Sequence, residues 1–86
     1  AKSMRRETQD ELYLLMQQAN AHVPKGRVIR HVKSGDKYMV YGHALREYDL
    51  ASLVLYAPVF GPVVVFSRPL TEVRSRFVLA DGVDWE

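Results

Sequence analysis

The residues of this chain that could do chemistry are two histidines, two acids and a few arginines. His31 and His43 fall in segments with strand character, and Glu47 and Asp49 stand two positions apart soon after His43. In extended chain such neighbours point the same way, so these carboxylates and His43 could form an acid/base or cation site. No serine or threonine can be matched with a base and oxyanion donors from the sequence. The constellation therefore lacks a nucleophile.

The two histidines are also the natural candidates for a metal site. A hairpin loop centred on Gly35 would set His31 opposite Met39 and Arg27 opposite His43. The two imidazoles would then lie four residues out of step, about 13 Å along a strand at ~3.3 Å per residue. Ligands of one zinc ion lie much closer than that. We expect no metal and no cofactor.

Arginines offer a different chemistry, the recognition of an anion. Arg30 and Arg68 fall within expected strands, and a guanidinium donates paired hydrogen bonds to phosphate or carboxylate. The ligand-binding face that we predict comprises Arg30, His31, Arg46, Tyr48 and Arg68. Neighbouring cationic and aromatic side chains could extend it into a nucleic-acid surface, formed by Lys33, Lys37, Tyr38 and Tyr41. In the structural alternative, Arg68 pairs with Glu72 and the tyrosines are core.

A helix must precede these residues. Thr8 and Glu11 have the capping-box spacing, which satisfies free amides at a helix start. Apolar residues then recur on one helical face, at Leu12, Leu15, Met16 and Ala19. The pattern predicts a helix over about residues 8–20, ended by Asn20 and Pro24.

After the helix, short segments rich in Val, Ile, Tyr and Phe alternate with turn residues, which predicts four or five strands. We place them at 27–33, 37–44, 52–57, 63–68 and 77–80. The runs 53–56 and 63–66 are apolar on both faces and need covering, either by closure of the sheet or by a second copy of the chain. We favour an α+β fold in which the N-terminal helix packs on a small antiparallel sheet that closes into an SH3-like barrel. Residues 1–86 form a single domain, with the β unit over about 26–82.

Composition is typical of a globular protein, with 48% hydrophobic and 26% charged residues and no cysteine. No run approaches the ~18 apolar residues of a membrane span, so we expect no membrane association and a cytoplasmic location. Charge is uneven along the chain. Residues 1–46 hold nine Lys or Arg against four acids, net +5, and residues 47–86 hold three against six, net −3.

A set of short motifs from Gly26 to Gly82 resembles a bacterial and phage family known as domain of unknown function 1653. The motifs are Arg30-His31, Tyr38-Met39-Val40-Tyr41-Gly42-His43-Ala44, Leu53-Val54-Leu55-Tyr56, Phe66 before Arg68-Pro69-Leu70, and Asp81-Gly82. The family usually carries a polar His-Ser-Glu-Thr stretch where this chain has Arg46-Glu47-Tyr48-Asp49. The resemblance implies no settled activity.

These observations favour a non-catalytic binding or adaptor module that recognises an anionic ligand or a nucleic acid. A homodimer and a protein partner are further candidates for its interactions. Two alternatives stay open. One is a small enzyme or sensor for a nucleotide-like metabolite, using Glu47, Asp49 and His43, and the other is a structural homo-oligomer joined through residues 53–66.

Overall fold

The computed structural model describes residues 8–85 and opens with helix α1, Gln9–His22. The predicted capping box is present: the Glu11 amide donates to Thr8 Oγ1 at 3.1 Å, and the Thr8 amide donates to Glu11 at 2.9 Å. The helix runs two residues further than expected, and Asn20 accepts from the Lys25 amide in the turn that follows. Within residues 8–85, no helix is long and apolar enough to cross a membrane.

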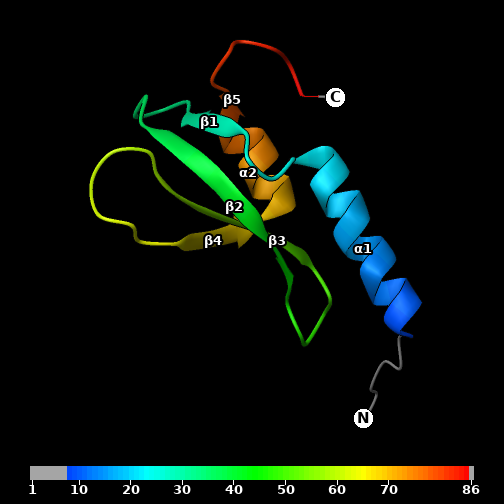
Figure 1. Cartoon of the computed structure of the whole chain (residues 1–86). Coiled ribbons are helices and arrows are strands. Elements are labelled where there is room, and N and C mark those ends of the chain that lie inside the picture. Colours follow the sequence, from blue (N-terminus) through cyan, green and yellow to red (C-terminus); the bar gives the residue numbers. More distant parts are fainter. Residues whose placement is uncertain (1–7, 86) are drawn as a thin grey trace.

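Five strands form one antiparallel sheet in the order β4-β3-β2-β1-β5 (Figure 1). Their bounds are Val28–His31 for β1, Lys37–Leu45 for β2, Ser52–Pro58 for β3, Phe66–Pro69 for β4 and Phe77–Leu79 for β5. A short helix, α2 (Leu70–Arg76), connects β4 to β5 across the sheet. The α+β prediction with an N-terminal helix is confirmed.

The sheet is open, so the predicted closure into an SH3-like barrel is not confirmed. Among the described strands β4 pairs only with β3 and β5 only with β1, so these two are the sheet's edges. The strand predicted at 63–68 begins only at Phe66, because residues 63–65 make no ladder with a neighbouring strand. Apolar content was therefore a poor guide to pairing in this segment.

The first hairpin has a different register from the one predicted. Arg30 lies opposite Lys37 and Ile29 opposite Tyr38, a shift of three positions. The reason is local. His31 Nδ1 is within 3.2 Å of the Ser34 amide, and the Gly35 amide donates to the His31 carbonyl, so β1 ends at His31 rather than at Lys33. This shift decides which charges meet across the strands.

The core lies on the sheet face covered by both helices. Val23, at the end of α1, and Val73, in α2, join it with the strand residues Ile29, Val40, Val54, Tyr56, Phe77 and Leu79. Phe77 is the aromatic centre: its ring meets those of Tyr38 and Tyr56 edge-on, with centroids 5.7 and 5.4 Å away. Burying such a ring contributes about 1.5–3 kcal/mol by apolar transfer alone. The opposite sheet face carries Arg30.

Candidate anion-binding site

The five predicted ligand-binding residues do not form one surface. Arg46 and Tyr48 lie in the loop between β2 and β3, and Arg68 and His31 lie on the core face of the sheet. Arg30 alternates with the buried Ile29 along β1, so its side chain leaves from the other face. The structure therefore does not bring the five residues onto one face, and each residue has to be assessed by itself.

Arg46 is already neutralised within its own loop. It holds Asp49 with two hydrogen bonds, Nε to Oδ1 at 3.0 Å and Nη2 to Oδ2 at 2.8 Å, and its guanidinium stacks 4.9 Å from the centre of the Tyr48 ring. These bonds, with a further one from the Ala51 amide, lower the pKa of Asp49 from 3.8 to about 2. The tyrosine ring is 81% exposed. The charged groups of this loop are therefore bonded to one another and do not form an open binding site.

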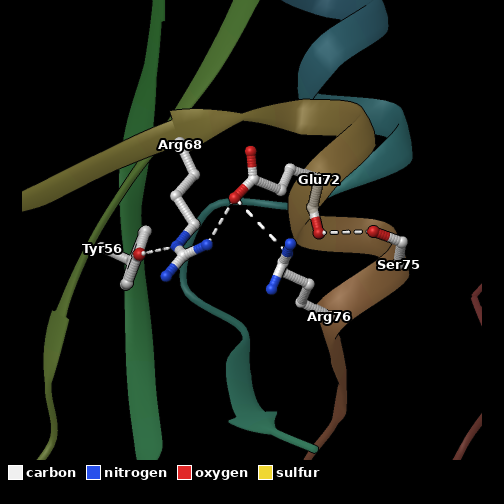
Figure 2. Close-up of polar contacts among 5 residues, drawn as sticks. All are labelled: Tyr56, Arg68, Glu72, Ser75 and Arg76. Atoms are coloured by element: carbon white, nitrogen blue, oxygen red, sulfur yellow. Dashed lines mark hydrogen bonds and ion pairs between the residues drawn. The ribbon is translucent and has the colours of Figure 1, made fainter.

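Arg68 is also engaged, as Figure 2 shows. Its Nε donates to the Tyr56 hydroxyl at 2.8 Å, and Nη1 pairs with Glu72 of α2. The same Glu72 oxygen lies 3.5 Å from Arg76 Nε, so one carboxylate bridges two arginines. Hydrogen bonding to Tyr56 is the main cause that raises the pKa of Arg68. In the structural alternative, Arg68 pairs with Glu72 and the tyrosines Tyr38, Tyr41 and Tyr56 are core. The contacts of Arg68 and the packing of Tyr38 and Tyr56 fit this alternative, whereas Tyr41 is 45% exposed.

His31 serves the hairpin turn and the core edge. Its ring packs edge-on against Phe77 at 4.9 Å between centroids, and Nδ1 faces Ser34, with the amide at 3.2 Å and the hydroxyl at 3.3 Å. Because an amide only donates, Nδ1 is the acceptor in that contact. One side of the imidazole is thus committed to structure.

Arg30 is the exception among the predicted arginines. Within residues 8–85 its side chain makes no hydrogen bond or ion pair, although the residue is partly buried. It lies directly opposite Lys37, so that two cationic side chains, Arg30 and Lys37, are neighbours across β1 and β2. Like charges at directly opposed positions destabilise a sheet by the order of 0.2–1 kcal/mol. An anion held between them would remove that repulsion.

A small cavity of about 170 Å³ adjoins Arg30. Its walls come from β5 and the segment after it, through Val78, Leu79, Gly82, Val83, Asp84 and Trp85. Trp85 is fixed by its indole N–H, which donates to the Phe77 carbonyl at 3.0 Å, and Arg74 lies over its ring. The cavity thus combines one guanidinium, apolar walls and one carboxylate, that of Asp84.

The turn that forms this cavity is held by its own polar bonds. Arg27 pairs with Asp81 at 2.9 Å, and Asp81 Oδ1 accepts from the Val83 amide. Gly82 takes a φ of +83°, a conformation that glycine adopts without strain. These contacts turn the chain back beside β5, so the Asp81-Gly82 motif positions the cavity walls, one of which is Gly82 itself.

The proposed acid/base group of Glu47, Asp49 and His43 is not assembled. His43 Nε2 lies 2.6 Å from the Val23 carbonyl, and since a carbonyl only accepts, Nε2 carries the proton. Asp49 is held by Arg46, and no described hydrogen bond joins His43 to either acid. The register places His31 level with Asp36, seven positions from His43, roughly 23 Å along a strand. Among residues 8–85 no three His, Asp or Glu side chains gather as for a metal ion.

Sequence reasoning missed the walls of the Arg30 cavity. Trp85 is packed partly buried beside β5. Asp84 and Val83 carry no local pattern that announces a site. Only the turn at Asp81-Gly82 signalled that the chain folds back here.

Comparison with known proteins leaves this geometry to be interpreted by itself. No family model matches the chain, and no match was found among curated proteins or among solved structures.

Proposed function

We propose that this chain is a non-catalytic binding module that recognises an anionic group, a phosphate or a carboxylate, at Arg30 with help from Lys37. The observation that carries the proposal is the state of the arginines. Arg46 and Arg68 are paired with carboxylates, whereas Arg30 faces a second cation and has no described partner. An arginine in that position gains more from an external anion than one that must first release an internal acid.

The size of the cavity sets the kind of ligand. A volume of about 170 Å³ is below the ~300 Å³ at which pockets enclose whole small molecules. The site therefore suits one charged group displayed on a larger partner, such as a backbone phosphate of a nucleic acid or an acidic side chain. Trp85 provides an apolar wall for whatever adjoins that group.

The family resemblance and the SH3-like relationship belong to the same proposal. The strand order, with the last strand beside the first and a short helix before it, supports an SH3-like arrangement whose sheet remains open. Arg30, which begins the Arg-His motif, and Gly82, which closes the Asp-Gly motif, both border the proposed site. One residue from each of these two motifs therefore lines the same cavity.

Amide-shift NMR titrations test the proposal. The ligands are inorganic phosphate, a nucleoside monophosphate, short single-stranded RNA and DNA, and a glutamate-rich peptide, each at low and at physiological salt. We expect saturable shifts at Arg30, Lys37, Val78 and residues 82–85 that weaken with salt. The ligand that binds most tightly identifies the source of the charge.

Three variants sharpen the titration. Arg30→Gln should weaken binding about tenfold or more, since a charged hydrogen bond contributes about 1.5–3 kcal/mol. Asp84→Asn should tighten binding because it removes a like charge from the cavity. Arg46→Gln, which makes the same charge change at a paired arginine, is the matched control and should leave the affinity unchanged. Shifts centred on Arg46 or Arg68, or none with any ligand, would refute the proposal.

A further inference from the structure

The most exposed apolar part of the described chain lies far from the anion site. Between β3 and β4 six large apolar side chains within eight residues are between 39% and 84% exposed: Val59, Phe60, Val63, Val64, Val65 and Phe66. Figure 1 shows this segment as the wide yellow arc beside β4. We call residues 59–66 the apolar arc. Exposed apolar clusters of this kind mark interaction surfaces or aggregation hazards.

Part of the backbone of the arc is open as well. Within residues 8–85, residues 63–65 belong to no strand and enter no backbone hydrogen bond. They lead directly into β4, which pairs with β3 on one side and forms the sheet edge on the other. An unpaired, β-branched run continuous with an edge strand is a template for another strand.

The composition of the apolar arc indicates which strand would pair with it, namely a second copy of the same segment. Residues 59–67 contain no Lys, Arg, Asp or Glu, so a copy of the segment meets no repulsion, and no charge selects a different partner. A two-fold interface requires a surface complementary to itself, which an uncharged Val-Val-Val-Phe run satisfies. A lipid surface would cover the side chains but would leave the amides and carbonyls of 63–65 unpaired.

We propose that the apolar arc joins two copies of this chain, with residues 63–67 of one protomer antiparallel to the same residues of the other about a two-fold axis near Val65. The two open sheets then become one continuous sheet. This pairing sets the valines of the two copies side by side and satisfies the backbone groups that point toward the partner strand. It is independent of the anion site, which lies at β1 and β5.

Sedimentation velocity tests the association between about 10 µM and about 1 mM protein, the range of dissociation constants that modest interfaces give. We expect the 9.9 kDa chain to double in mass as concentration rises. Val64→Lys should weaken dimerisation at least tenfold by setting like charges close to the axis. The matched control is Leu14→Lys, which changes a residue of similar exposure on α1, 53% against 49%, and should leave the dimer intact.

Cysteine crosslinking tests the geometry, because the chain has no cysteine of its own. Val65→Cys should form a disulfide-linked dimer under mild oxidation, whereas Tyr48→Cys, in a loop where the native side chain is even more exposed, 81% against 51%, should remain single. Several results would overturn the proposal. They are a constant monomer mass, a dimer insensitive to Val64→Lys, growth beyond two copies, or a monomer whose binding to phosphatidylserine vesicles is lost in Val64→Lys.

Discussion

At the level of single residues, the arginines differ in whether each has a carboxylate partner within the chain. The sequence carried part of this information, since Arg46 and Asp49 are three apart and Arg68 and Glu72 four apart. Such spacings bring opposite charges together on a turn or helix. Arg30 has no acid at these spacings, and the residues that lie beside it come from other strands. Its isolation follows from the register, which local spacing does not determine.

The ion pair in the β2–β3 loop predicts a specific acid titration. Asp49 has a pKa lowered from 3.8 to about 2 by Arg46 and the Ala51 amide, so the folded state binds its proton more weakly than the unfolded state. This carboxylate therefore contributes stability above pH ~4 that is lost as the pH falls toward 2. Carboxyl-carbon NMR should show a midpoint near pH 2. In Arg46→Gln the midpoint should move back toward 3.8, and an unchanged midpoint would contradict the assignment to Arg46.

At the level of elements, Arg68 connects three of them, since it lies on β4 and binds Tyr56 on β3 and Glu72 on α2. Arg68→Met keeps the aliphatic stem but leaves the phenol and carboxylate without this donor. Because both ends of the ion pair are about a third exposed, we expect a loss near the lower end of the range for such bonds, about 1 kcal/mol. Urea unfolding measures it.

The control for that measurement is Arg76→Met on the same carboxylate. Its contact is longer, at 3.5 Å, and its side chain is 60% exposed, so the free energy of unfolding should fall by less than ~0.5 kcal/mol. Equal losses in the two variants would mean that Glu72, rather than the connection to Tyr56, carries the effect.

Elements were more predictable than their pairing. The start of α1 followed from Thr8 and Glu11, because capping is satisfied within four residues. The register of β1 against β2 did not follow, because it depends on how His31 and Ser34 close the turn. The segment 63–65 has the composition of a strand and lacks a neighbour, so composition alone over-predicted β4. The Arg30 site depends on the unpredicted register of β1 against β2 and on the unpredicted pairing of β1 with β5.

At the level of the whole molecule, basic and acidic residues divide along the sequence, but the fold mixes them. Arg27 of the basic half binds Asp81 of the acidic half, and Arg30 shares its cavity with Asp84. The net charge of +2 therefore predicts little about partners. The two proposed surfaces lie at opposite edge strands of one sheet, which would let a dimer built through β4 present two anion sites at its far ends.

The pairing of β5 with β1 also has a consequence for the order in which the molecule opens. It joins residues about 50 positions apart, such as Ile29 and Leu79, whereas the β2–β3 hairpin closes between Leu45 and Ser52. Contacts across long loops form late in folding and carry a larger closure entropy. The three-residue edge strand β5 should therefore detach while β2 and β3 remain paired.

Hydrogen exchange can follow this opening. We expect the amides of β5 that bond to β1 to exchange faster than those of the β2–β3 ladder, and a saturating anion should slow β5 selectively, because the cavity exists only when β5 is docked. Uniform exchange across the sheet would contradict this order. If this order holds, occupancy of the Arg30 site is coupled to the docking of β5, and the bound ligand stabilises the pairing of β5 with β1.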